Sequence, residues 1–331
     1  MQMKELMKKF RSPGPEFRGA PFWAWNAKLD KKELIRQIHI FKEMGLGGFF
    51  MHSRVGLDTV YLGKDWFDCI KACVNEAKKL GMQAHLYDED RWPSGTAGSL
   101  VTRDDRYKYR YCSLRIYSRA ADALKDEKGT PLAWFSARVS GSVKDLDLAL
   151  KDPIRLKSPA DFKFGRGRKL IRFAVCLQDN DSWFNGAAYL DTLNPEAVEK
   201  FVEVTHESYF REIGKEFGKT VPSIFTDEPN YWTRGRSGLA LPWTDKLPEI
   251  FRKKYNLDIL DYLPELFFSS VRRNSSVRLK YYNLLTELFC TAFSGTIGKW
   301  CAKHNIRMTG HALQEDKLNQ TLYGGAAMRF Y

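Results

Sequence analysis

The sequence lacks the features that mark a membrane or exported protein. No apolar run approaches the roughly 20 residues that a membrane-spanning helix requires. Residues 1–17 are basic but have no apolar core like that of a signal peptide. The 331 residues are 44% hydrophobic and 28% charged, which is ordinary for a globular protein. We therefore expect a cytoplasmic protein without a membrane partner, while its oligomeric state stays open.

Common metal-binding and redox pairs are also absent. The six cysteines include no Cys-x-x-Cys pair, and four of them lie in apolar helical or strand patterns, so buried free thiols are expected. Cys69 and Cys73 share one face of a predicted helix, but no His or Cys partner lies near them in sequence, which disfavours a zinc site. The sequence requires no cofactor.

Acidic residues are fewer than basic ones, which gives a net charge of +13. The excess is concentrated in residues 151–170, where seven Lys or Arg accompany two Asp. This segment lacks apolar periodicity and an aromatic stacking platform, so we predict a solvated loop there. Nucleic acid is not predicted as a partner.

The first 100 residues alternate between strand and helix patterns. Three short apolar runs are predicted to be strands: Phe22–Trp25, Gly48–Met51 and Gln83–Tyr87. Asp30 and Glu33 form a capping-box pattern that predicts the start of the first intervening helix. Strands joined by amphipathic helices indicate a parallel sheet with right-handed crossovers.

The pattern changes after residue 102. Three β-rich runs follow without helices between them: Tyr107–Tyr117, Pro131–Val139 and Lys169–Leu177. They predict an inserted antiparallel β element over residues 103–187. Strands like those of the first 100 residues are predicted again at Tyr189–Leu193, 222–227 and Ile306–His311. Residues 241–304 are predicted to be a mainly helical insertion.

These patterns predict an α/β fold, a (β/α)8 TIM barrel truncated after about six strands. Residues 1–102 would carry strands 1–3, residues 103–187 the β-rich insertion, and residues 188–331 the rest of the barrel with its helical insertion. A closed barrel needs eight strands, so we expect the sequence to be a fragment of a longer protein.

Carboxylates follow the strand over residues 222–227. Asp227 and Glu228 come directly at its end, and Pro229 follows. Active sites of TIM barrels lie at the C-terminal ends of the strands. Glycosidic bond cleavage needs one carboxylic acid and a second carboxylate, and a negative neighbour raises the pKa of an acid. Glu228 is therefore the predicted acid.

Similar polar clusters follow other strands. Asp88, Glu89 and Trp92 come after the third strand, where oxygens can bind a sugar or a Ca²⁺ ion and the indole can stack on a sugar ring. His311 ends the last strand, and Glu315 beyond it is a candidate second carboxylate. His52 is a sugar-contacting candidate, with an ordinary role in the core as the alternative.

Four segments together make the chain recognisable: Pro21-Phe22-Trp23-Ala24-Trp25-Asn26, Gly47-Gly48-Phe49-Phe50-Met51-His52-Ser53-Arg54, Tyr87-Asp88-Glu89-Asp90-Arg91-Trp92-Pro93-Ser94-Gly95 and Thr309-Gly310-His311. They resemble the α-L-rhamnosidase-like glycoside hydrolases of family 106, from about residue 17 to the last residue. The resemblance implies a TIM-barrel catalytic domain, two catalytic glutamates, inversion at the anomeric carbon and a nearby calcium ion. It matches Glu228 to the acid, and the base is Glu315 or lies in strands that this sequence does not contain.

The sequence thus predicts a glycoside hydrolase that cleaves terminal α-L-rhamnosides or a related deoxy sugar, with a carbohydrate as its partner. Besides the catalytic pair Glu228 and Glu315, the predicted substrate-binding residues are His52, Arg54, Asp88, Glu89, Trp92, Asp227 and His311. One alternative is a metal-dependent TIM-barrel hydrolase that uses His52, His85, Asp88 and His311, although a His-x-His pair is missing. The other is a carbohydrate-binding fragment without catalysis.

Overall fold

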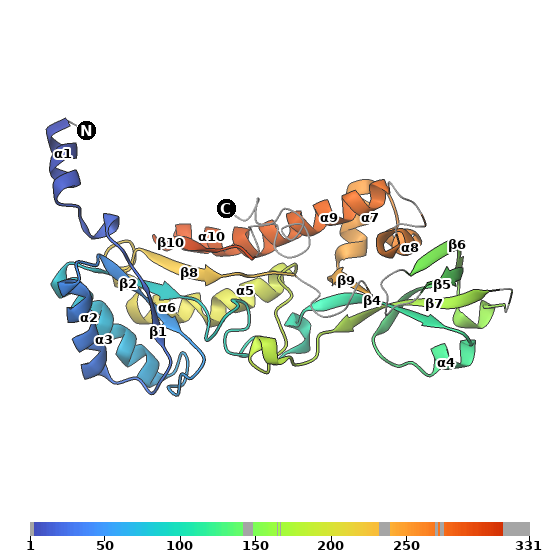
Figure 1. Cartoon of the computed structure of the whole chain (residues 1–331), viewed down its shortest axis with the longest axis horizontal. Coiled ribbons are helices and arrows are strands. Elements are labelled where there is room, and N and C mark those ends of the chain that lie inside the picture. The colour runs from blue at the N-terminus through green and yellow to red at the C-terminus, as the bar shows by residue number, and fades with distance from the viewer. Residues whose placement is uncertain are drawn as a thin grey trace.

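The computed structural model describes residues 3–141, 148–163, 165, 167–231, 239–268, 271 and 275–313. Two five-stranded sheets organise this part of the chain, one parallel and one antiparallel. They lie toward opposite ends of the elongated molecule (Figure 1). The strand C-termini of the parallel sheet point toward the antiparallel sheet, so that end of the sheet lies toward the middle of the molecule.

The parallel sheet has the strand order β1-β2-β3-β8-β10. Its strands are β1 (Phe22–Trp25), β2 (Gly48–Ser53), β3 (Gln83–Tyr87), β8 (Ser223–Asp227) and β10 (Arg307–His311). The ring of Phe22 on one edge strand lies 4.8 Å from that of Phe225 on β8 and 5.9 Å from that of His311 on the other edge strand. The sheet is therefore strongly curved, although no pairing joins β1 to β10 among the described residues.

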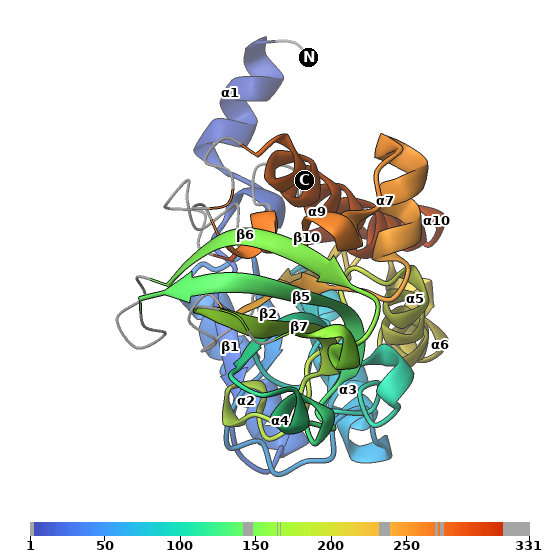
Figure 2. The ribbon, with the colours of Figure 1, turned by 90° about the vertical axis from the view of Figure 1, so that its right-hand side faces the viewer.

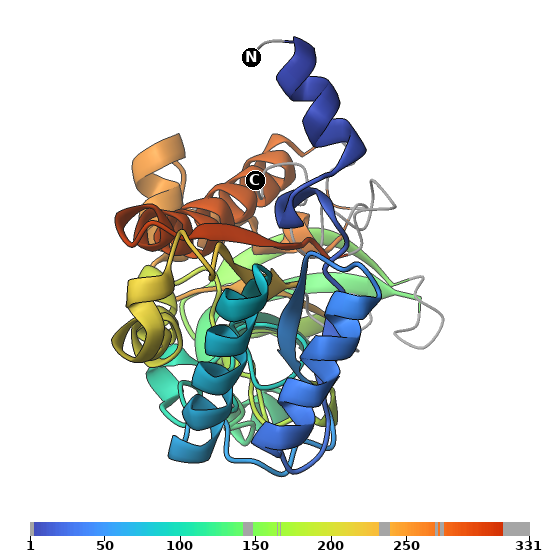
Figure 3. The same cartoon turned by 90° about the vertical axis from the view of Figure 1, so that its left-hand side faces the viewer.

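Helices cover the convex face of this sheet. They are α2 (Lys31–Glu43), α3 (Lys64–Leu80), α5 (Pro195–Val204), α6 (His206–Ile213) and α10 (Gly295–Lys303). The Asp30 side chain caps α2 by accepting a hydrogen bond from Glu33 N, as the sequence predicts. Figure 3 shows α2 and α3 side by side and α1 (Met3–Arg11) projecting from the body. No described helix combines the length and apolar character that crossing a membrane requires.

The antiparallel sheet has the order β6-β5-β7-β4-β9 (Figure 2). Its strands are β4 (Arg110–Tyr117), β5 (Thr130–Ser140), β6 (Ala149–Leu156), β7 (Arg168–Leu177) and β9 (Ala240–Trp243). Strands β4, β5 and β7 overlap the three predicted β-rich runs. Strand β9 comes from a distant segment and pairs with β4 from Ser113 to Arg110.

Short elements connect the sheets, and a helical segment follows β9. The helices are α4 (Ala120–Leu124), α7 (Leu247–Tyr255), α8 (Leu263–Phe267) and α9 (Ser276–Phe289), and a π-helical turn over Cys290–Ser294 joins α9 to α10. The 3₁₀ turns are Pro15–Phe17, Asp105–Tyr107, Pro159–Asp161, Ser182–Phe184, Gly214–Glu216 and Ile259–Tyr262. Of residues 241–304, predicted to be mainly helical, the first three belong to β9, and α7, α8, α9 and α10 lie in the remainder where the structure describes it.

Two sequence predictions are wrong. Residues 189–193 form no strand of the parallel sheet, because Tyr189 O and Asp191 N bond to the segment that leads into β4, and β3 pairs directly with β8. Residues 151–170 are not simply a loop, since β6 runs from Ala149 to Leu156. Its charged side chains suit an edge strand, where they discourage pairing with other chains.

Candidate functional site

The concave face of the parallel sheet carries a layer of polar side chains at the strand ends. Side chains alternate between the two faces of a strand. Tyr87 on β3 and Asp227 on β8 meet on the concave face, where the Tyr87 hydroxyl donates to Asp227 Oδ2 at 2.9 Å. One layer below, His85 Nδ1 lies 2.7 Å from Ser223 Oγ. A second polar pair thus lies beneath the first on the same face of the sheet.

Asp227 is the centre of this layer and is 6% exposed. His52 Nε2 lies 3.9 Å from its Oδ2, and His311 Nδ1 lies 3.7 Å from its Oδ1. Burial raises the pKa of Asp227, against the Tyr87 hydrogen bond and the charges of His311 and Arg54. Asp227 is thus a buried carboxyl group with one hydroxyl donor and two imidazole rings around it.

His52 is buried and neutral. Burial, with help from the nearby Arg54 charge, lowers the pKa of His52 to about 3. Its ring stacks on Phe22 at 4.9 Å and meets the edge of Tyr87 at 3.9 Å. Its Nε2 has no hydrogen-bond partner in the described structure. Neutral imidazole at this depth is therefore rigidly placed beside Asp227.

Glu228 occupies a different position from its neighbour Asp227. It is half-buried, and its φ of 49° places it in the left-handed region, which is costly for a residue with a side chain. Its backbone N–H donates to His311 O at 3.1 Å. Trp92 Nε1 donates to Glu228 Oε2 at 2.7 Å. The turn thus holds a carboxyl group at the end of β8, bonded to an indole from the loop after β3.

Asp88 faces away from this layer. It follows Tyr87, and its N–H continues the ladder by donating to Phe225 O at 3.0 Å, so its side chain lies on the helix-covered side. It is fully buried, and its charge contributes to raising the pKa of Cys301 on α10. Ser94 Oγ donates to Asp88 Oδ1 at 2.6 Å and accepts from Asp227 N at 2.7 Å. Asp88 therefore anchors the loop to β8 through Ser94.

Glu89 is also fully buried, and it orders the loop that carries Trp92. Its carboxylate accepts hydrogen bonds from the backbone N–H groups of Asp90, Gly95, Thr96, Ala97 and Gly98. Gly95 and Gly98 have φ of 142° and 60°, which lets successive N–H groups converge on one anion. Burial raises the pKa of Glu89 to about 7, although these donors favour the ionised form.

The structure thus brings the predicted residues together in two groups. His52 and His311 lie around Asp227 with Arg54 nearby, and Glu228 pairs with Trp92. Asp88 and Glu89 lie beneath the loop, and Glu315 lies outside the described residues. Sequence reasoning missed Tyr87 and Ser94. The alternation of side chains along β3 is the signal that favours Tyr87 over Asp88 as a residue of the concave face.

In the described part of the chain, no three His, Cys, Asp or Glu side chains lie close enough together to hold a metal ion. The ligands of the metal-dependent alternative are separated by strand alternation, because His52 and His85 face the concave side and Asp88 the helices. The calcium ion that the resemblance implies stays a prediction.

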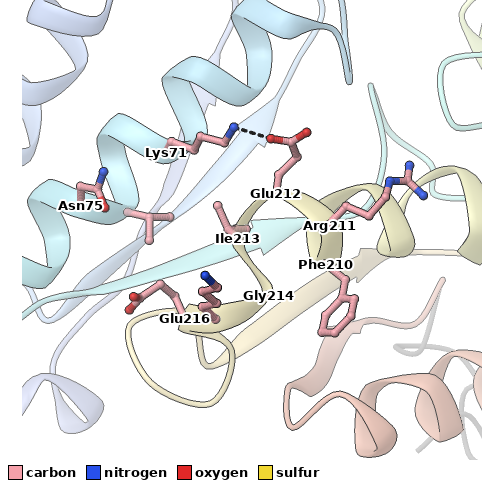
Figure 4. Close-up of a pocket in the computed structure, with 10 residues that line it drawn as sticks. Lys71, Asn75, Phe210, Arg211, Glu212, Ile213, Gly214 and Glu216 are labelled. Carbon is pink, nitrogen blue, oxygen red and sulfur yellow. Dashed lines mark ion pairs between the residues drawn. The ribbon is translucent and has the colours of Figure 1, made fainter.

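An open pocket of about 730 Å³ lies elsewhere, between α3 and the end of α6 (Figure 4). Lys71 and Asn75 line it from α3, and Phe210 lines it from α6. Lys71 forms an ion pair with Glu212 across it. None of the predicted site residues lines this pocket, and it lies among helices on the convex side of the sheet.

Comparison with known proteins gives a likeness of fold. No protein-family model matches the chain, and no curated protein matches its sequence. A solved structure of a rhamnosidase from Novosphingobium sp. PP1Y matches with a TM-score of 0.60 at 14% sequence identity. The match covers 93% of this chain and 47% of that chain, so this chain spans about half the length of that rhamnosidase. The chain is thus distantly similar in structure to a glycoside hydrolase.

Proposed function

We propose that this chain is the barrel-forming part of a glycoside hydrolase that acts on terminal α-L-rhamnosides or a related deoxy sugar. The observation that carries the proposal is the placement of Glu228 beside Asp227, at the C-terminal end of β8, with Trp92 bonded to the Glu228 carboxyl group. The likeness in fold to a rhamnosidase supports the sugar class. The curvature of the parallel sheet supports an incomplete (β/α)8 barrel.

In this proposal Glu228 is one of the two carboxyl groups that the reaction needs. Asp227, His52, His311 and Arg54 would bind sugar hydroxyls, since they surround one point on the concave face. A second carboxyl group, with Glu315 as the candidate, would lie about 6.5 to 9.5 Å from Glu228 if the enzyme inverts the anomeric centre. Asp88 and Glu89 would support the site by ordering the loop of Trp92.

The test is hydrolysis of an aryl α-L-rhamnoside by the full-length protein and its Glu228→Gln variant. Loss of a catalytic carboxyl group typically lowers kcat by about 100-fold or more, as expected for general acid–base catalysis. Glu199→Gln is the matched control, because Glu199 is exposed on α5. Retention of most activity by Glu228→Gln would refute the role of Glu228. Sugar binding without turnover by the wild-type protein would favour a binding function instead.

A further inference from the structure

We infer that three buried hydroxyl groups, placed where the chain enters the antiparallel sheet at β4 and where it returns after β7, hold the turn that follows β8. They belong to Tyr109, Tyr189 and Thr192, which we call the hydroxyl clamp. These residues are positioning residues, and they make the antiparallel sheet part of the candidate site. The inference rests on the proposed function for its effect on catalysis, but the clamp itself can be tested without a substrate.

The clamp binds the backbone of the segment that follows β8 and its turn. Asn230 N–H donates to the Tyr189 hydroxyl at 3.2 Å, and the Thr192 hydroxyl donates to Asn230 O at 2.8 Å. The Tyr109 hydroxyl donates to Tyr231 O at 2.9 Å. Buried backbone groups need partners, and here side chains supply them where a neighbouring strand would otherwise do so.

Tyr189 also reaches the loop that carries Trp92. Its hydroxyl donates to Ser94 O at 2.5 Å while it accepts from Asn230 N. Burial raises the pKa of Tyr189, so the hydroxyl keeps its proton and can be donor and acceptor together. One hydroxyl group thus fixes the separation of two segments, the loop of Trp92 and the turn of Glu228.

The turn needs this support because its backbone is strained. Glu228 has a φ of 49°, a conformation that persists only where surrounding contacts fix it. Asn230 Nδ2 donates to Glu228 O at 3.1 Å, so the position of Asn230 sets that of the turn. The clamp holds Asn230 through both its N–H and its C=O. Loss of the clamp should therefore let the turn relax and displace the Glu228 carboxyl group.

The clamp is fixed because the entering and returning segments pair with each other. Tyr109 N–H donates to Tyr189 O at 2.7 Å, and Asp191 N–H donates to Tyr107 O at 2.8 Å. An isolated antiparallel bridge lies between these two contacts. The three side chains of the clamp are at most 3% exposed. The geometry is thus set before a substrate binds, as a preorganised site requires.

The first experiment measures hydrogen exchange of the Asn230 amide by NMR. Tyr189→Phe keeps the ring and removes the acceptor of the Asn230 N–H, so exchange should become about fivefold faster or more. Tyr281→Phe is the matched control, because the equally buried Tyr281 hydroxyl donates to Pro242 O at 2.5 Å, outside the clamp. Unchanged exchange in Tyr189→Phe, or equal acceleration in the control, would overturn the inference.

The second experiment measures kcat and KM for hydrolysis of an aryl α-L-rhamnoside. Tyr109→Phe, Tyr189→Phe and Thr192→Val should each lower kcat by about tenfold with little change in KM, because the buried clamp orients a reacting group and does not bind substrate. Thr192→Ser, which keeps the hydroxyl, and Tyr281→Phe should retain the wild-type kcat. An equal loss of kcat in Tyr281→Phe, or clamp variants with unchanged kcat, would overturn the positioning role.

The two experiments separate this inference from the proposed function. If the wild-type protein hydrolyses no rhamnoside, the proposed function fails, while hydrogen exchange at Asn230 still decides whether the clamp holds the turn.

Discussion

Replacement of Glu89 by glutamine should strongly destabilise the protein, although it changes only one oxygen to an NH₂ group. Oε1 accepts from two backbone N–H groups and the Thr96 hydroxyl, and Oε2 accepts from three backbone N–H groups. Whichever oxygen becomes NH₂, at least two buried N–H donors lose their acceptor and face another donor.

The magnitude follows from these contacts. A buried donor without a partner costs about 1 to 3 kcal/mol, so two or three of them cost on the order of 2 to 9 kcal/mol. Removal of a buried negative charge offsets part of this, because burial penalises the ionised form of Glu89. We therefore expect a loss of about 3 kcal/mol from the free energy of unfolding, which is typically about 5 to 15 kcal/mol for a domain.

Urea unfolding followed by far-UV circular dichroism measures this loss. Glu199→Gln is the control, since the same chemical change at an exposed helical position should alter stability by less than about 0.5 kcal/mol. If Glu89→Gln is as stable as this control, the carboxylate does not order the loop and the reasoning is refuted.

Three further outcomes are expected. Tyr87→Phe removes the donor to Asp227, so the pKa of Asp227 should rise further, as 13C NMR titration would show; an unchanged pKa would refute the contact. Burial lowers the pKa of His85 to about 4 and that of His206 to about 3, so their neutral forms belong to the folded state. In the folded protein both rings should stay neutral between pH 7 and 5, so these two groups favour unfolding as the pH falls below about 6.5; a 13C NMR titration in which either ring of the folded protein protonates near pH 6.5 would contradict this. Finally, Cys290 is the half-buried thiol among five buried ones, so Ellman's reagent should label at most this cysteine in native protein and all six in urea; rapid labelling of several native thiols would count against the packing.

Local signals in the sequence predict the parallel sheet well. The apolar run before Asp227 and the capping residues at Asp30 and Glu33 act within a few residues, so β8 and α2 could be predicted from them. The predicted extra strand at 189–193 fails because its strand-forming composition carries no information on which backbone it meets. Pairing of β9 with β4 is missed for the same reason, as it joins segments far apart in sequence.

The candidate site was predictable in position but not in the direction of its side chains. The sequence predicts that Asp227 and Glu228 lie at the C-terminal end of a strand, and β8 indeed ends at Asp227 with Glu228 directly after it. The role of Glu89 depends on loop N–H groups that converge only in the folded structure, so a carboxylate predicted to bind sugar is found bonded to its own loop. The contact of Trp92 with Glu228 likewise joins two loops.

The most direct test of the central claim is a crystal structure of the protein with a bound rhamnose-type inhibitor. The account predicts the sugar at the C-terminal ends of β3 and β8, with a hydroxyl or ring atom within about 3.2 Å of a Glu228 or Asp227 carboxyl oxygen. A sugar bound instead in the pocket beside Lys71 and Phe210, with the end of the parallel sheet empty, would contradict it.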